Sequence, residues 1–495
     1  MAETSKRRRV WAEAAALLLL SAGIRLGYVW AVPRMLDSAD AIHYLETART
    51  FSQGDFLAVD PKIPALYPAL TAIVGLVCSN IETAGQVVSF IFSVLLVLPV
   101  YFLSRHLHDG RVAPIAGLLV AMWPWLIDYG NRVATEPTAV FFWMLGALCM
   151  VRGLDPKGST AWMIGAALSF GALHLARAEG TFVLLAAAGA GAIAGWHGEW
   201  RPVLRKLAVY VAVASVLLVL HAFYMHALVG QWTVNYRVGF IGEQPEGSTV
   251  FAEFGKTLVA MSADVPAVML GPLLWALFGV GMAWPRTRST GSVRAEGMLL
   301  YFAAVQWLIV LPVLSPAPRY LMAAFVALSL WSARGIMSCS DAIGNLTPRV
   351  WLRLAPLGIV LVWMALHLGA AVATERWDRG GLPAQPWEYK ITGEWMRDNL
   401  ESGPIVTRKP QVGYYAEMPT IGVETDATLD EIIAHAGAVG ARYLIVDERY
   451  TTALVPALAP LLDATAVPES LRVLRADLSP YPDGRIVVYE FIRGR

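Results

Sequence analysis

Apolar residues occur along most of the chain in long runs, and the length of each run indicates which structure it forms. A helix needs about 20 mostly apolar residues to cross a bilayer. Eleven runs are near that length, at 10–32, 83–103, 112–128, 136–152, 161–176, 180–196, 207–229, 266–284, 297–314, 320–338 and 353–373. A further run, 64–78, holds about 15 residues and includes Pro64 and Pro68, so we expect a re-entrant or interfacial helix there. The pattern predicts a polytopic α-helical membrane protein with about 11 transmembrane helices.

Lysine and arginine residues indicate the orientation of these helices. The first run follows Lys6-Arg7-Arg8-Arg9, which favours a cytoplasmic N-terminus. If 64–78 does not cross, the acidic loop 33–63 lies outside and the basic loops lie inside, as the positive-inside rule requires. If 64–78 crossed, the basic loops would face outward, so we prefer eleven spans. The inner loops then hold Arg105, Arg111, Lys157, Arg201, Arg205, Lys206, Arg286, Arg288, Arg294 and Arg349.

The pattern changes after Ala373, where short alternating elements replace the apolar runs. Helices are expected at 387–400 and 428–438, and strands at 404–409, 441–447 and 485–492. Alternating helices and strands are typical of a small α/β domain. We therefore expect two domains, a transmembrane domain at 1–375 and a soluble α/β domain at 376–495. With eleven spans and an inner N-terminus, the soluble domain is extracytoplasmic.

Composition agrees with this architecture and excludes some functions. Hydrophobic residues make up 56% of the chain and charged residues 16%, whereas soluble domains contain about 25% charged residues. The net charge of +1 gives no basis for nucleic-acid binding, which requires a strongly basic face. The three cysteines, Cys78, Cys149 and Cys339, lie in or beside apolar runs without the paired spacing of a metal site, so we infer no disulfide.

Ionisable residues gather at the ends of spans that this topology places outside. They are Asp40, Arg132, Glu136, Arg177, Glu179 and Arg319. The three arginines oppose the positive-inside rule, and charges beside a membrane are costly unless they are paired or hydrated. Because guanidinium matches phosphate with two parallel hydrogen bonds, a lipid phosphate at the outer leaflet is the natural partner.

Each of these residues also has a structural explanation. For Asp40, the alternative is a place in or beside a helix cap, because Asp37 or Ser38 could cap the helix that follows them. Glu136 precedes Pro137, as at the first turn of a helix. Arg177 could pair with Glu179, and Arg319 could extend to the interface. His43, His174 and His221 form no recognisable metal set, and such single histidines are more often structural.

Taken in order, these residues resemble motifs of the GT-C superfamily of membrane glycosyltransferases. The chain is most similar to the family 39 protein O-mannosyltransferases and the lipid A aminoarabinose transferases. The matching segments are Asp40 with Tyr44, Gly54-Asp55-Phe56, Pro64-Ala65-Leu66-Tyr67-Pro68, Thr135-Glu136-Pro137, Arg177-Ala178-Glu179-Gly180 and Pro318-Arg319-Tyr320-Leu321, within roughly residues 10–340. Two positions depart from the pattern: Ala41 follows Asp40 where many relatives have Asp-Glu, and Ile63 stands in a Lys-Pro-Pro motif.

The resemblance implies transfer of a sugar from a polyprenyl-phosphate-linked donor to an acceptor hydroxyl at the outer face, with inversion at the anomeric carbon. Such a reaction needs a carboxylate to take the acceptor's proton and cations to stabilise the departing phosphate. Asp40 is the candidate base, and Glu136 would orient the acceptor or the base or help to hold a divalent cation. The candidate phosphate ligands are Arg319 first, then Arg177 and Arg132; the candidate substrate-binding residues are Tyr44, Tyr67, Glu179 and Tyr320.

Other functions share part of this pattern. A membrane transporter or lipid flippase would have the same spans, but such proteins tend to place their ionisable sites near the bilayer midplane and often contain internal repeats. A receptor or assembly factor that binds through its soluble domain would leave the outer charges unexplained. The sugar, the acceptor (protein, lipid or glycan), metal use and the oligomeric state are left open, and a plasma-membrane location is expected.

Overall fold

The computed structural model describes residues 2–196, 200–235, 271–284, 290–310, 318–376, 385–464, 467–476 and 484–492. The chain forms two compact units. The helical unit contains Met1–Trp30 and Tyr44–Gly369, and the α/β unit contains Ala31–His43 and Ala370–Arg495. The short segment 31–43, in the loop before the second predicted span, therefore groups with the C-terminal residues.

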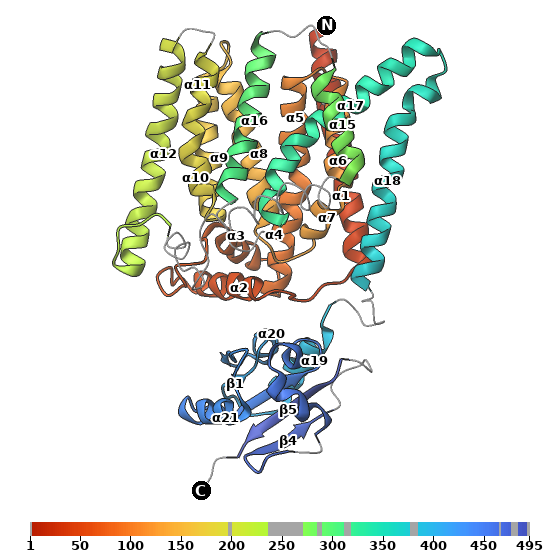
Figure 1. Ribbon diagram of the computed structural model, residues 1–495. Helices are drawn as coiled ribbons and strands as arrows, with labels where there is room; N and C mark the ends of the chain where they lie inside the picture. The colour runs from red at the N-terminus through yellow and green to blue at the C-terminus, as the bar shows by residue number, and fades with distance from the viewer. Residues whose placement is uncertain are drawn as a thin grey trace. The chain divides into compact units, whose positions relative to one another are not determined.

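The helical unit is built from long helices that run alongside one another (Figure 1). Shorter helices, α2 and α3, lie near the ends of these long ones. In chain order the helices are α1 (Ala2–Ala31), α2 (Ala39–Ser52), α3 (Leu66–Gly75), α4 (Ile81–Leu95), α5 (Val97–Leu107), α6 (Val112–Met122), α7 (Pro124–Tyr129), α8 (Glu136–Leu154), α9 (Thr160–Ala176), α10 (Gly180–Ala186), α11 (Ala190–Gly195), α12 (Trp200–Val229), α15 (Gly271–Ala283), α16 (Thr290–Val310), the 3-10 turn η4 (Pro318–Leu321), α17 (Met322–Leu346) and α18 (Val350–Arg376).

Each of the eleven predicted ranges contains a helix, which confirms a mostly helical membrane fold. Six helical segments of the described chain are long and apolar enough to cross a bilayer, and five more are apolar but shorter. Residues 266–270 and 311–314, at the edges of two predicted spans, lie outside the described residues, and the number of crossings stays a prediction. Helix α3 has 10 residues, about 15 Å at 1.5 Å per residue, which is half of the ~30 Å hydrocarbon core.

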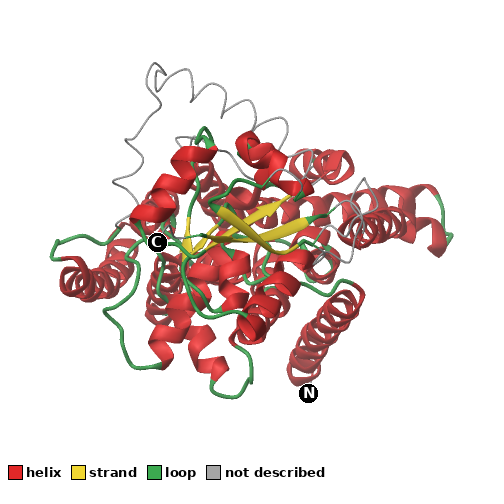
Figure 2. Cartoon of the chain, turned by 90° about the horizontal axis from the view of Figure 1, so that it is seen from below, coloured by secondary structure: helices red, strands yellow, loops and turns green. Residues whose placement is uncertain are grey.

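The α/β unit contains one five-stranded sheet with the order β2-β1-β3-β5-β4 (Figure 2). Strand β1 pairs in parallel with β2 and β3, whereas β5 runs antiparallel to β3 and β4. All five predicted elements are present, and β2, β4, α20, α22 and the 3-10 helix η5 were not predicted. The elements are α19 (Trp387–Asn399), β1 (Ile405–Val406), α20 (Gln411–Ala416), β2 (Thr420–Ile421), α21 (Leu429–Ala438), β3 (Tyr443–Asp447), α22 (Thr451–Leu454), the 3-10 helix η5 (Pro456–Asp463), β4 (Leu471–Arg475) and β5 (Ile486–Phe491).

Residues 31–43 join the α/β unit through specific contacts. The backbone N–H of Leu36 donates to the hydroxyl of Tyr415 at 3.0 Å. Arg34 forms an ion pair with Glu375 at 3.2 Å and a longer one with Asp37. These bonds tie the segment that begins α2 to the end of α18 and to α20.

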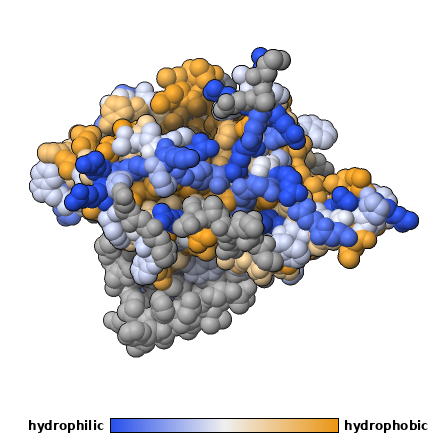
Figure 3. All heavy atoms as spheres, turned by 90° about the horizontal axis from the view of Figure 1, so that it is seen from above, coloured by the Kyte–Doolittle hydropathy of each residue, from blue (hydrophilic) through white to orange (hydrophobic). Residues whose placement is uncertain are grey.

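Basic residues gather at the end of the helical unit that carries the N-terminus. Figure 3 shows a band of hydrophilic side chains across this end, with hydrophobic residues at its edges. Lys6, Arg9, Arg105 and Arg111 line one hollow there, together with the acidic Asp109. These residues belong to the predicted cytoplasmic side. Two further predicted inner residues, Arg286 and Arg288, lie outside the described residues.

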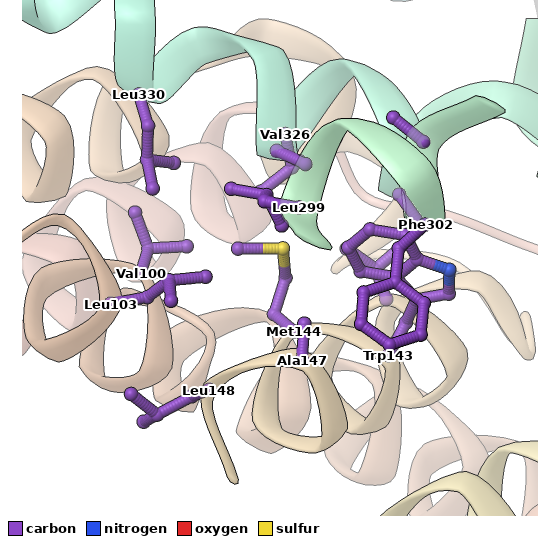
Figure 4. Packing of buried hydrophobic residues seen from close by; sticks show 14 of the residues in the cluster. Val100, Leu103, Trp143, Met144, Ala147, Leu148, Leu299, Phe302, Val326 and Leu330 are labelled. Carbon is purple, nitrogen blue, oxygen red and sulfur yellow. The ribbon is translucent and has the colours of Figure 1, made fainter. Parts of the chain in front are cut away.

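Helix α8 lies at the centre of the hydrophobic core. Its buried residues Trp143 and Met144 point towards residues of α5, α16 and α17, including Phe302 (Figure 4). Trp143 and Phe302 make an edge-to-face contact with ring centroids 6.1 Å apart. In contrast, only 11% of the apolar window of α12 and of α18 is buried. Large apolar side chains exposed along these two helices suit a lipid-facing surface.

Candidate active site

Several of the predicted outer charges meet in one pocket of the helical unit. The pocket, about 320 Å³ of space that is partly open to solvent, lies between the start of α8, the turn from α9 to α10, α16 and η4. Its polar and charged lining residues are Glu136, Arg177, Glu179, Gln306, Arg319 and Tyr320. Trp143, Leu173 and other apolar residues form the rest of its wall. Four chain segments that are far apart in sequence therefore contribute to one site.

Glu136 lies at the centre of these charges. It opens α8, with Pro137 as the next residue, as the sequence predicted. Its carboxylate accepts a hydrogen bond from Arg177 Nη1 at 2.8 Å and lies 3.7 Å from Arg319 Nε. The Glu136 side chain is only 6% exposed. The guanidinium groups of Arg177 and Arg319 therefore both lie close to one nearly buried carboxylate.

Arg177 occupies the turn between α9 and α10. It pairs with Glu136 and with Glu179, and its Nη1 also donates to Thr135 Oγ1 at 3.2 Å. Burial alone would lower the pKa of Arg177, but the carboxylates of Glu179 and Glu136 raise that pKa well above its usual value. The predicted pairing of Arg177 with Glu179 is present, but it is part of a larger network with Glu136.

Arg319 is more accessible than Arg177. The Arg319 side chain is 33% exposed, whereas that of Arg177 is 13% exposed. Both guanidinium groups lie near the ring of Tyr320, at 5.3 Å for Arg177 and 5.4 Å for Arg319, which is within the range of cation–π attraction. The η4 backbone is held by α16, because Gln306 Nε2 donates to the Tyr320 carbonyl at 2.9 Å.

Two of the three candidate tyrosines, Tyr44 and Tyr67, lie against each other. Tyr44 and Tyr67 make an edge-to-face contact with ring centroids 5.5 Å apart. The Tyr67 hydroxyl donates to the Gly85 carbonyl at 2.8 Å and accepts from the Ala134 N–H at 3.1 Å. Tyr67 is completely buried, so it holds α3 against α4 and the segment before α8. Its hydroxyl is engaged within the protein, and its ring supports Tyr44.

Arg132 pairs with a carboxylate that does not line this pocket. It forms an ion pair with Asp128, one turn earlier, at 2.8 Å. Asp128 in turn accepts a hydrogen bond from the Tyr28 hydroxyl of α1 at 2.8 Å. Arg132 does not line the pocket that contains Arg177 and Arg319.

Asp40 lies in the first turn of α2 and belongs to the α/β unit. Ser38 provides the cap of this helix, because its Oγ accepts from the backbone N–H of Ala41 at 3.2 Å. Of the two capping candidates, Ser38 therefore makes the bond. The capping role does not require the Asp40 carboxylate.

Comparison with known proteins identifies the fold of the unit that contains this pocket. Residues 62–226 match a family model described as dolichyl-phosphate-mannose-protein mannosyltransferase. No curated protein sequence matches the chain. Among solved structures, oligosaccharyltransferase AglB from Archaeoglobus fulgidus, in complex with an inhibitory peptide and a dolichol-phosphate, aligns with a TM-score of 0.64 and 14% identity over 92% of this chain and 72% of that one.

ArnT from Cupriavidus metallidurans in the apo state aligns with a TM-score of 0.60 and 15% identity over 99% of this chain and 98% of that one. The chain has the GT-C fold. The same ArnT bound to undecaprenyl phosphate aligns with a TM-score of 0.56 and 16% identity, over 96% of this chain and 97% of that one. The predicted resemblance to GT-C glycosyltransferases is confirmed, as is a multi-pass membrane protein with a small C-terminal sheet.

A metal site is a further question that the GT-C resemblance raises. Within the described parts of the chain, no three His, Cys, Asp or Glu side chains are grouped closely enough to hold a metal ion. We derive no reaction step through a metal ion.

Two features of the helical unit were not predicted from the sequence. Gln306 was missed because it lies inside an apolar run and has no motif around it. His174 and His221 were treated as separate structural residues, but His174 Nε2 lies 2.7 Å from His221 Nδ1. The predicted topology placed both histidines towards the outer ends of their helices, and this shared level was the available indication that they meet.

Proposed function

We propose that the chain transfers a sugar from a polyprenyl-phosphate-linked donor to an acceptor hydroxyl at the outer face of the membrane, with inversion at the anomeric carbon. The observation that carries this proposal is the convergence of Arg177 and Arg319 on one pocket of a GT-C fold. Two structures of similar fold contain the lipid part of such a donor, dolichol-phosphate in AglB and undecaprenyl phosphate in ArnT.

In the proposed reaction, the oxygen of the acceptor hydroxyl forms a bond to the anomeric carbon while the bond from that carbon to the phosphate oxygen breaks. The phosphate keeps the electron pair of the broken bond, and the hydroxyl proton passes to a carboxylate. Asp40 is the proposed base for this proton. Negative charge that develops on the phosphate requires cations already in place.

Arg319 is the best candidate to meet that charge. It is the more exposed of the two arginines, and its side chain lines the pocket. Arg177 is held by three side chains and is proposed to support the phosphate from a fixed position. Tyr320, whose ring lies 5.3 Å from the Arg177 guanidinium and 5.4 Å from that of Arg319, is proposed to orient both.

The remaining candidates receive narrower roles. Glu136 is proposed to balance the charges of Arg177 and Arg319 until the donor phosphate replaces it, and Glu179 to hold Arg177. Tyr44 lies one helical turn after Asp40 on α2 and is proposed to contact substrate, with Tyr67 as its support. For Arg132 the pairing with Asp128 and Tyr28 favours a structural role.

Donor binding is the first test, because it needs only the lipid. In purified protein, Arg319→Ala is expected to weaken binding of undecaprenyl phosphate or dolichyl phosphate by about 10- to 100-fold, since a charge-assisted hydrogen bond is worth roughly 1.5–3 kcal/mol. Arg132→Ala is the matched control, because it removes the same side chain from the same predicted side. We expect it to change binding by less than about threefold, below 1 kcal/mol.

Transfer is the second readout, measured as release of polyprenyl phosphate from a panel of polyprenyl-phosphate sugars in native membranes. Asp40→Asn should bind donor normally and lose transfer by about 10²- to 10⁴-fold, because it cannot take the acceptor's proton. Near-normal transfer by this variant would remove Asp40 from the base role. A wild-type protein that binds no polyprenyl phosphate and moves a solute across vesicles would establish the transporter alternative.

A further inference from the structure

A second pocket in the helical unit shares the turn that carries Arg177. Ala178 lines this second pocket, whereas Arg177 and Glu179 line the first. About 460 Å³ of space, part of it open to solvent, lies between segment 61–65 and helices α9 and α12. The donor-phosphate candidates therefore have a second, partly open pocket beside them.

A short chain of hydrogen bonds runs along one wall of the second pocket. Thr181 Oγ1 donates to the Ala178 carbonyl at 3.0 Å, since a carbonyl oxygen can only accept. The same Thr181 oxygen lies 2.8 Å from His174 Nδ1 and accepts from Asn235 Nδ2 at 3.1 Å. Because the hydroxyl proton is already directed to Ala178, His174 Nδ1 is the donor in its contact with Thr181.

The direction of these hydrogen bonds also determines which ring nitrogen of His221 carries the proton. A neutral imidazole that donates from Nδ1 has a bare Nε2. His174 Nε2 therefore accepts from His221 Nδ1, 2.7 Å away. By the same rule His221 Nε2 is bare, and His221 lines the pocket. Within the described segments, no residue donates a hydrogen bond to this nitrogen.

The His221 ring is held in place from its other side. It stacks on Tyr224 with ring centroids 6.1 Å apart and an interplanar angle of 18°. The Tyr224 hydroxyl donates to the carbonyl of Phe56 at 3.0 Å. The bare nitrogen thus belongs to a fixed ring that lines the cavity, together with Pro64, Leu175, Met225 and the basic Lys62.

We propose that this second pocket binds a sugar and that His221 Nε2 accepts a hydrogen bond from one of its hydroxyl groups. A bare imidazole nitrogen suits a hydroxyl donor, and the apolar walls suit the C–H faces of a sugar ring. The inference rests on the proposed glycosyltransferase function. Two sources carry the same chemistry: the sugar of the lipid-linked donor and a sugar of the acceptor.

The test uses the full chain in nanodiscs with ¹⁵N-labelled histidine, because nitrogen chemical shifts report which ring nitrogen is protonated. His221→Gln assigns the His221 signals. We expect Nδ1-protonated His221 and a shift of its Nε2 signal when a polyprenyl-phosphate sugar is added, but not when polyprenyl phosphate alone is added. A shift caused by soluble methyl glycosides in the absence of the lipid identifies the acceptor as the source.

Thr181 supplies a matched pair of variants. Thr181→Val removes the oxygen that fixes His174, so both rings should redistribute between tautomers and the sugar should bind about tenfold more weakly, as for one lost hydrogen bond. Thr181→Ser keeps the oxygen and should behave as wild type. A wild-type His221 protonated at Nε2, or one that no sugar affects while polyprenyl phosphate binds normally, would overturn the proposal and leave the proposed function standing. Failure to bind any polyprenyl phosphate would instead count against the proposed function.

Discussion

Glu136 combines an ordinary structural position, the start of a helix, with contacts to two arginines of the proposed active site. It begins α8 and precedes Pro137, which is an ordinary position for an acidic residue at a helix start. At the same time it meets Arg177 and Arg319 from two other segments. The charges of Glu136 and Glu179 balance those of the two arginines. A phosphate that enters this pocket would therefore compete with carboxylates for the arginines.

That competition leads to a prediction for Glu136→Gln. The amide keeps the shape of the side chain but removes its charge, so binding of undecaprenyl phosphate should be as tight as in the wild type or tighter. Thermal stability should fall, by roughly 1–3 kcal/mol, because a nearly buried bond to Arg177 loses its charge. Binding isotherms and unfolding of the same preparation give both numbers. Weaker phosphate binding would mean that Glu136 acts chiefly by orienting the arginines.

The sequence predicted some of these residue groupings and not others. Glu136, Arg177 and Arg319 could be grouped because each occurs in a recognisable motif and the topology puts each at the outer level. The same level also holds Arg132, which pairs with Asp128 instead. The predicted topology gives the depth of a residue in the membrane. Its position in the plane of the membrane depends on how the helices pack. The meeting of His174 with His221 depends on that packing too.

At the scale of elements, close helix packing depends on small residues. Helices α15 and α17 approach so closely that a Cβ placed on Gly281 would lie 2.0 Å from the carbonyl oxygen of Trp331. A Cβ on Gly335 would lie equally close to the carbonyl oxygen of Leu277. Two glycines therefore allow the backbones to meet, as small residues do in membrane helix pairs. Helix α17 leads directly from η4, so this contact also supports Arg319.

Gly281→Ala should therefore destabilise the helical unit, by about 1–3 kcal/mol as in other overpacked interiors. Gly279→Ala is the control, since no atom lies within 4 Å of a Cβ at Gly279. The control should be neutral or slightly stabilising, because alanine favours a helix by about 1 kcal/mol over glycine. Apparent melting temperatures in one detergent compare the two variants. Equal melting temperatures would show that α15 and α17 can separate at little cost.

Elements were predictable where the pattern was long enough. The apolar runs exceed the length of a helical turn many times over, so each predicted range contains a helix. Strand β2 has two residues, and β4 has five, of which two are arginines and three are apolar. Strands this short carry little periodicity, and their pairing with β1 and β5 is set by the rest of the sheet. Helix α20 is likewise only six residues long.

At the scale of the whole molecule, the active-site proposal depends on which side of the membrane each loop faces. The deciding element is α3. With 10 residues it spans about 15 Å, so it should not carry the chain across ~30 Å of hydrocarbon. If α3 stays on one side, loop 33–63 and the α/β unit face the same side, and the basic loops face the other. If α3 crosses, the loop between α8 and α9 lies on the same side of the membrane as loop 33–63.

Cysteine labelling in intact cells separates these topologies. In a background with Cys78, Cys149 and Cys339 replaced by alanine, we expect Gln53→Cys and Asp426→Cys to react with an impermeant maleimide from outside, because both positions are exposed. Lys157→Cys, in the exposed turn between α8 and α9, should react only after permeabilisation. Labelling of Lys157→Cys from outside together with Gln53→Cys would show that α3 crosses. Labelling of Gln53→Cys and Asp426→Cys from opposite sides would rule out an outer site that uses Asp40 beside the α/β unit.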